Sequence, residues 1–320
     1  MERQMQYNLC CISEELKDDG FKFQTMTWKR FNQLRDEHGE DHALEALGAR
    51  WLNNLKVTVA TIEHCAKHGW GYRMSSGLFP LLTHPDFNHE FNDVPQCNEL
   101  HSLFLDVTAN NAWQVRLSMH PDQFNVLASE NEDSVNRTIR ELNYHGWLMD
   151  MMGCRRGYWN PINIHVNNTK GDPKQIADRF FANLKRCDHS VISRLVVENE
   201  DKGIWNVSTL LEYFYKPYRI PITFDTLHHF CNPSPDLITD FGEDNAMEFC
   251  DLTWDTRPIF HYSESHPNKP NPRSHADNPT DLPPCHAMDW DIELKNKDKA
   301  IRMLYAIELT QESQRVGLYD

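Results

Sequence analysis

Short apolar segments that end in a histidine or a carboxylate recur along this chain of 320 residues. In V-R-L-S-M-H, the β-branched start predicts a buried strand, and His120 and Pro121 follow where that strand would stop. Later segments end in the same way: N-I-H at His165, V-V-E-N at Glu198, T-F-D at Asp225, I-F-H at His261 and D-I-E at Glu293. One such ending has little meaning, but a series of them predicts a ring of ligands.

Helical patterns separate these strands, and no change in composition divides the chain. We expect strands near residues 6–12, 72–75, 115–120, 160–165, 194–199, 220–225, 257–261 and 287–293. We expect helices over 27–66, 98–110, 132–152, 173–187, 207–214, part of 235–252 and 297–311, with a polar loop at 13–20. This alternation predicts the α/β class: a single-domain (β/α)8 TIM barrel over residues 1–320, with its chemistry at the C-terminal ends of the strands.

The sequence composition indicates in which compartment of the cell the protein is found. The N-terminus has no apolar stretch of signal-peptide length, and no segment approaches the roughly 18 apolar residues of a membrane span. The nine cysteines include no C-x-x-C pair, and Cys10 and Cys11 are adjacent, so neither a disulfide framework nor a thiolate zinc site is indicated. We therefore expect a cytoplasmic protein with reduced thiols and no membrane partner.

The net charge of −15 argues, taken alone, against a nucleic-acid partner, whose phosphates would be repelled. Divalent cations held by a carboxylate cluster would offset part of that charge and would place positive charge at the site itself. The sign of the whole molecule therefore does not exclude DNA.

The candidate ligands differ in how much each indicates alone. A lone histidine such as His165 is more often a core residue that donates to a backbone carbonyl. A carboxylate such as Glu198 at the end of a buried strand is costly unless it is paired or bound to metal, so both interpretations stay open for it. Asp225 is followed by His228 and His229, a short loop away, and either histidine could be the ligand. Taken together, these histidines and carboxylates would not all fall at strand ends by chance.

The donor atoms indicate the chemistry. Imidazole nitrogen and carboxylate oxygen without thiolate suit Zn²⁺ or Mn²⁺, and several carboxylates can bridge two ions about 3.5–4 Å apart. Such a cluster polarises a phosphoryl group, activates water and stabilises the leaving oxygen of an in-line displacement. Phosphate-ester hydrolysis is the natural reaction, although a similar ring could hold a sugar for isomerisation.

The chain resembles the UV-damage endonuclease family, a (β/α)8 relative of endonuclease IV. The matching blocks lie in order between Arg73 and Lys299: R-M-S-S-G-L-F-P-L-L-T-H-P, R-L-S-M-H-P-D-Q-F-N-V-L-A-S, I-H-V-N-N-T-K-G-D-P, L-V-V-E-N-E-D, F-D-T-L-H-H, F-H-Y-S, H-A-D and D-I-E-L-K-N-K-D-K. The resemblance implies cleavage of damaged double-stranded DNA on the 5′ side of ultraviolet photoproducts and some other lesions. It implies 3′-hydroxyl and 5′-phosphate ends and two or three divalent metal ions, most often Mn²⁺, with Zn²⁺, Mg²⁺ or Co²⁺ as alternatives and no nucleotide cofactor.

The resemblance also implies roles for individual residues. Glu198 would bridge two ions, and the other ligands divide into three sets: His120 and His165 on one ion, Asp225, His261 and Glu293 on the second, and His228 with His275 on a third. His84 matches a histidine near the family's cluster. Gln123 and Phe124 match the pair that the family inserts into the duplex, with phenylalanine in place of tyrosine.

Three further positions depart from the family pattern. Leu9 and Ser13 stand where the family has a tyrosine and an asparagine that face the damaged DNA, and Ile259 stands where a lysine is usual. These departures leave the metal ligands intact and put the range of lesions in question. The alternatives are an abasic-site endonuclease of the endonuclease IV type, a metal-dependent sugar isomerase or epimerase, and a non-catalytic, metal-stabilised binding protein.

Overall fold

The computed structural model describes residues 5–110, 115–122, 124–239, 242, 244–285 and 287–316. Eight short parallel strands form its centre: β1 (Tyr7–Cys10), β2 (Gly71–Met74), β3 (Leu117–Met119), β4 (Ile162–Ile164), β5 (Leu195–Glu198), β6 (Ile222–Thr223), β7 (Ile259–Tyr262) and β8 (Asp289–Ile292). Each lies within or at the edge of a segment that the sequence predicts as a strand. All of their residues are buried, as strands inside a barrel require.

The strands follow the order β6-β5-β4-β3-β2-β1-β8-β7. The barrel closes between β6 and β7, where Asp225 and His261 form a parallel bridge and the backbone N–H of His261 donates to the Phe224 carbonyl at 2.8 Å. Because all strands are parallel, their C-terminal ends meet at one mouth of the barrel. The predicted α/β barrel is confirmed.

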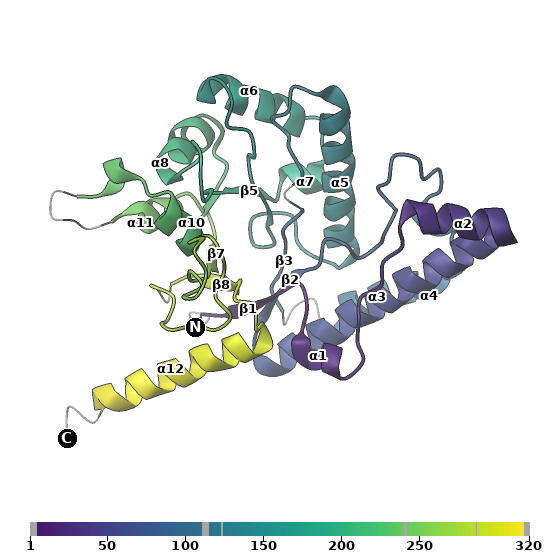
Figure 1. Ribbon diagram of the computed structural model, residues 1–320, viewed down its shortest axis with the longest axis horizontal. Helices are drawn as coiled ribbons and strands as arrows, with labels where there is room; N and C mark the ends of the chain where they lie inside the picture. The colour runs from purple at the N-terminus through teal and green to yellow at the C-terminus, as the bar shows by residue number, and fades with distance from the viewer. Residues whose placement is uncertain are drawn as a thin grey trace.

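Helices surround the strands, and α12 extends away from them toward the C-terminus (Figure 1). The helices are α1 (Glu14–Asp18), α2 (Trp28–His38), α3 (Glu40–His68), α4 (Cys97–Asn110), α5 (Glu132–Met151), α6 (Pro173–Leu184), α7 (His189–Ile192), α8 (Val207–Leu210) with a π-helical turn over Leu211–Tyr215, α9 (Lys216–Tyr218), α10 (Thr226–Cys231), α11 (Ala246–Asp251) and α12 (Asp298–Val316). Single 3₁₀ turns cover Phe91–Asp93 and Pro235–Leu237.

Three local predictions were wrong. Residues 14–18, expected as a polar loop, form α1, because the Ser13 side chain accepts from the Leu16 N–H and so caps the helix. Asp225 and His228 were expected a short loop apart, but His228 lies on α10, whose first turn Asp225 caps in the same way. The single helix predicted over 27–66 is divided at Gly39 into α2 and α3.

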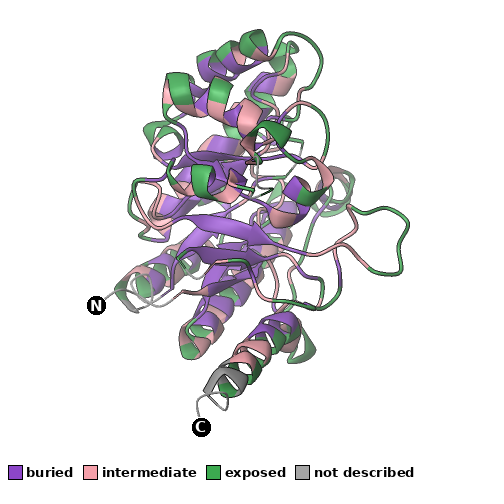
Figure 2. Ribbon diagram, turned by 90° about the vertical axis from the view of Figure 1, so that its left-hand side faces the viewer, coloured by how far each residue is buried: buried purple, intermediate pink, exposed green. Residues whose placement is uncertain are grey.

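The strands and the inner faces of the helices are buried, and the outer helix faces are exposed (Figure 2). At the N-terminal end of the barrel, a buried ion pair joins Arg116 to Asp289 at 2.7 Å. At the other end the buried polar groups include several histidines and carboxylates. Among the described residues, none of the helices has the length and apolar character needed to cross a membrane.

Candidate metal centre

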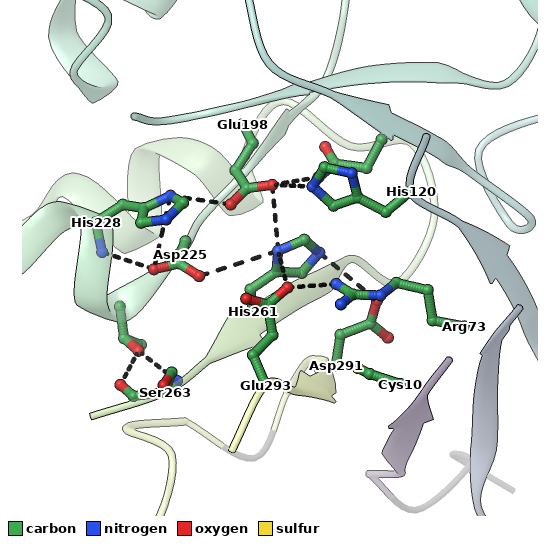
Figure 3. Close-up of polar contacts among 12 residues, drawn as sticks. Cys10, Arg73, His120, Glu198, Asp225, His228, His261, Ser263, Asp291 and Glu293 are labelled. Carbon is green, nitrogen blue, oxygen red and sulfur yellow. Dashed lines mark hydrogen bonds and ion pairs between the residues drawn. The ribbon is translucent and has the colours of Figure 1, made fainter. Parts of the chain in front are cut away.

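Glu198 stands at the middle of the C-terminal mouth of the barrel (Figure 3). It ends β5, and only 1% of its surface is exposed. Its Oε2 lies 3.0 Å from Nε2 of His120 and 3.2 Å from Nδ1 of His261, and its Oε1 lies 3.0 Å from Nδ1 of His228. Nε2 of His165 is 3.8 Å from Oε2. Four histidines, three at the ends of β3, β4 and β7 and one on α10, therefore face one carboxylate.

A second set of donors lies beside the first. Nδ1 of His261 is 4.0 Å from Oδ2 of Asp225 and 3.4 Å from Oε1 of Glu293. Two groups have ligand atoms that all lie within 4.8 Å of one another, and Glu198 belongs to both: His120, His165 and Glu198, and Glu198, Asp225 and His261. A carboxylate shared by two such groups is the arrangement that can bridge two cations.

Local structure fixes the orientation of these side chains. Nδ1 of His120 lies 3.0 Å from the Pro121 carbonyl, to which it can donate, so Nε2 is the nitrogen that faces Glu198. Asp225 Oδ1 accepts from the His228 N–H at 2.6 Å, which turns His228 toward the centre. The adjacent His229 points elsewhere and contacts Asp244 through Nε2 at 2.6 Å. Of the two histidines that the sequence left open, His228 is the one at the centre.

Buried donor atoms without partners indicate that the centre suits a cation. Within the described ranges, Asp225 Oδ2, His261 Nδ1 and His165 Nδ1 are buried and have no hydrogen-bond partner of acceptable geometry. Buried polar atoms are rarely left in this state unless an ion or water completes them. Imidazole and carboxylate donors without thiolate fit Mn²⁺ or Zn²⁺.

The electrostatics of the metal-free protein point the same way. Burial alone would raise the pKa of Glu198, but the surrounding histidines outweigh it and hold this pKa well below its usual range. Burial acts to lower the pKa of His228 and His261, yet neighbouring carboxylates raise them to about 11 and about 9. Burial lowers the pKa of His165 to about 4. In the metal-free protein, protonated His228 and His261 thus supply the positive charge that the carboxylates attract. A metal ion would have to displace those protons.

Two further predicted residues lie at the edge of the centre or outside it. His275 is next to Glu293, with Nδ1 3.2 Å from its carbonyl and 3.8 Å from Oε2. His84 is apart from the Glu198 contacts: its ring stacks on Trp28 at 4.9 Å, and its Nδ1 accepts from the Asp86 N–H.

The predicted wedge lies beside His84. Phe124 is 81% exposed. His84 and Phe124 line the same surface pocket of about 510 Å³, together with Asp122 and Arg137. Gln123 lies outside the described residues.

The other three departures from the family pattern, at Leu9, Ser13 and Ile259, are buried. Leu9 has no exposed surface and Ile259 has 2%, so both serve the barrel core. Ser13 donates to Asp298 at 2.7 Å while it caps α1. None of the three offers an exposed side chain to DNA.

Sequence reasoning missed residues that support the ligands. Asn163 donates to Glu198 Oε2, and Arg73 donates to Glu293 Oε1. Asn199 accepts from the Asp225 N–H at 2.8 Å and donates to its carbonyl at 3.1 Å. Asn163 lies two residues before His165, so the period of two along a strand would have placed it on the inward face.

A third group of possible ligands lies away from the barrel mouth: Glu15, His64 and His68. Both carboxylate oxygens of Glu15 already accept from the guanidinium of Arg302, at 2.7 and 2.8 Å. The same guanidinium lies 3.3 Å from His68 Nε2. Because a fixed positive charge occupies this place, the group does not suit a metal ion.

Glu200 gives a pH-dependent prediction for the metal-free protein. Burial raises its pKa to about 7 from 4.5, so the folded state is penalised once the carboxylate ionises. The penalty is absent below pH 4.5, grows up to pH 7, and reaches about 3 kcal/mol above it. Glu200→Gln keeps an acceptor for the Asn167 N–H. We expect the free energy of unfolding of this variant, relative to that of wild type, to rise between pH 5 and pH 8. Urea unfolding in the presence of chelator measures it, and a difference that does not change with pH would contradict the prediction.

Known proteins are similar to this chain in both sequence and fold. The family model UV-endonuclease UvdE matches residues 5–317. The UV DNA damage endonucleases of Bacillus velezensis and Bacillus pumilus are 30% and 28% identical, over 89% and 92% of this chain and 88% and 91% of theirs. The crystal structure of SacUVDE superposes with a TM-score of 0.77 at 27% identity, over 97% of this chain and 99% of that one.

A more distant likeness shows the fold alone. Endonuclease IV from Thermus thermophilus gives a TM-score of 0.50 at 14% identity, over 79% of this chain and 94% of that one. The resemblance that the sequence motifs indicate is confirmed by a family match over nearly the whole length. The chain belongs to the UV-endonuclease family.

Proposed function

We propose that the protein is a DNA-repair endonuclease that hydrolyses the phosphodiester on the 5′ side of ultraviolet photoproducts in duplex DNA, and leaves a 3′-hydroxyl and a 5′-phosphate. The observation that carries the proposal is the shared carboxylate Glu198, in two groups of ligands, in a chain that matches the family over residues 5–317. We also propose that residues 1–320 form one catalytic domain, and that the protein has the cytoplasmic location that the sequence predicts.

Two or three divalent ions, most readily Mn²⁺, fit the donor set. Glu198 would bridge two of them, with His120 and His165 on one side and Asp225, His261 and Glu293 on the other. His228 uses Nδ1 toward Glu198 and the Asn199 carbonyl at 2.9 Å, so Nε2 is the atom that it can offer to a third ion with His275. When bound, such ions neutralise the phosphate and stabilise the departing 3′ oxygen of an in-line displacement.

The protein's own residues hold this geometry. Asn163 and Asn199 tie Glu198 and Asp225 to neighbouring strands, so the bridging carboxylate and its neighbour cannot rotate freely. Burial of Glu198, Asp225 and His261 excludes water from the far side of the centre, which strengthens each electrostatic interaction there. The open side of the barrel mouth is where a phosphodiester would enter.

Phe124 is proposed to enter the duplex at the lesion with Gln123. An 81% exposed phenylalanine four residues beyond His120 has no core to fill, and its ring can stack on an unpaired base. Asp122 supports the loop, because its Oδ1 accepts from the Phe124 N–H at 3.2 Å.

Phe124→Ala is expected to weaken discrimination between irradiated and intact duplex about tenfold, since base–aromatic stacking is worth about 1–3 kcal/mol. Competition binding with the two duplexes measures this, and the metal content should not change. Phe249→Ala is the control, because Phe249 is also partly exposed but lines a different groove, on α11. Equal discrimination by Phe124→Ala and wild type would remove the wedge.

The reaction itself is tested on a labelled duplex with one photoproduct at a known position. We expect a single Mn²⁺-dependent cut immediately 5′ of the lesion. The new 3′ end should be extended by a polymerase without prior treatment, which shows a 3′-hydroxyl. A cut on the 3′ side, or a blocked 3′ end, would contradict the proposed reaction.

A further inference from the structure

Asp291 is a buried carboxylate directly beneath the candidate centre (Figure 3). It lies on β8 two residues before Glu293, so both side chains point into the barrel. Only 1% of its surface is exposed. Oδ1 accepts from Asn8 Nδ2 at 2.8 Å, and Oδ2 lies 3.7 Å from Nη1 of Arg73. Burying a carboxylate costs folding free energy unless neighbouring groups pair with it or donate hydrogen bonds to it.

The ring of His261 lies between Asp291 and the candidate ligands. Its Nδ1 faces the cluster, 3.2 Å from Glu198 Oε2 and 3.4 Å from Glu293 Oε1. Its Nε2 faces the opposite way, 3.6 Å from Asp291 Oδ2. A histidine that binds a metal through one nitrogen usually donates its other N–H to a carboxylate, which fixes the tautomer and the ring orientation.

We propose that Asp291 is a positioning residue that holds the proton of His261 on Nε2 and so presents the lone pair of Nδ1 to a metal ion. The distance of 3.6 Å exceeds an ordinary hydrogen bond, and a shift of about half an ångström at Nε2 completes the contact. The inference rests on the proposed metal centre and adds a residue to it.

Asn8 and Arg73 keep Asp291 in this role. The Asn8 amide fixes one carboxylate oxygen from β1. The guanidinium of Arg73 lies between two carboxylates, since it donates to Glu293 and contacts Asp291. This positive charge holds Asp291 back from the cluster, so that Glu293 faces the metal side and Asp291 faces the histidine. One network from β1, β2 and β8 therefore positions both His261 and Glu293.

The test compares two isosteric changes on the same strand. Asp291→Asn removes the charged acceptor behind His261. Asp289→Asn is the matched control, because Asp289 is equally buried but faces Arg116 at the other end of the barrel, where three backbone carbonyls also bind that guanidinium. Asn8→Ala is a milder second variant that loosens Asp291 without breaking an ion pair. Zn²⁺ affinity, measured against a competing chelator, is the first readout.

We expect Asp291→Asn to weaken Zn²⁺ binding about 10- to 100-fold. Asn8→Ala should weaken it less, and Asp289→Asn should lower the melting temperature and leave Zn²⁺ affinity within about twofold. The second readout is ¹⁵N-detected imidazole NMR of the Zn²⁺-loaded protein, in which His261 should carry its proton on Nε2. If Asp291→Asn does not fold, Asn8→Ala decides the same comparison.

Unchanged Zn²⁺ affinity in Asp291→Asn, or an equal loss in Asp289→Asn, would overturn the role of Asp291. A proton on Nδ1 of His261 would do the same. These results differ from a failure of the metal centre itself, in which the wild-type protein would bind no Zn²⁺ tightly.

Discussion

Glu198→Gln is expected to lower the rate of nicking of irradiated DNA about 10³-fold or more, because it removes the proposed bridging charge, on which several kcal/mol of transition-state stabilisation would depend. Glutamine has nearly the same shape and still offers one oxygen to Asn163. Two of the surrounding histidines hold protons because of nearby carboxylates, so a neutral group also changes their charge. We therefore expect fewer metal ions per molecule together with the loss of nicking.

The control for this change is Glu308→Gln. Glu308 is a half-buried carboxylate that contacts the Tyr7 hydroxyl at 2.5 Å on the outside of the barrel, and its change removes the same charge from the whole protein. It should nick at the wild-type rate. Circular dichroism should show that both variants are folded. Wild-type nicking by Glu198→Gln with metal bound would remove the proposed role of Glu198.

Arg116→Met is expected to lower the free energy of unfolding by about 3–5 kcal/mol, the usual cost of leaving one partner of a buried ion pair alone. Arg116 has almost no exposed surface. Its guanidinium binds Asp289 at 2.7 Å and the backbone carbonyls of Trp159, Pro258 and Arg257. Methionine fills part of the space and satisfies none of these acceptors.

Chemical denaturation in chelator measures this cost. Arg140→Met, the same change on the outer side of α5, should stay within about 0.5 kcal/mol of wild type. Because Arg116 lies at the end of the barrel away from Glu198, the number of bound metal ions per folded molecule should not change. A loss as small as that of Arg140→Met would show that the pair does not stabilise the barrel.

The sequence predicts much of the fold because several strands are short apolar runs with a polar residue at the end. Glu198 and His261 fall at such ends, and the structure brings them together with His120, His165, Asp225 and Glu293. A parallel barrel leaves those ends only one place to meet, so spacing along the chain is sufficient to find them. The roles of these residues toward metal remain predictions.

Other features depend on contacts between distant residues. Ser13 caps α1 with the help of Asp298, 285 residues later in the chain, and local polarity alone indicates a loop there. His228 and His229 cannot be distinguished by sequence, since the capping bond from Asp225 decides which ring faces Glu198. In the sequence, nothing distinguishes Asp291 from other strand residues, because its contacts with β1, β2 and β7 are made only in the folded barrel.

The most direct measurement is nicking of three supercoiled plasmids, untreated, ultraviolet-irradiated and depurinated, by protein stripped with chelator and reloaded with Mn²⁺. We predict no nicking after stripping and, after reloading, faster nicking of the irradiated plasmid than of the other two. Nicking of the depurinated plasmid alone would mean an abasic-site enzyme instead. Equal nicking of all three plasmids, or none by the reloaded protein, would contradict a metal-dependent endonuclease for ultraviolet damage.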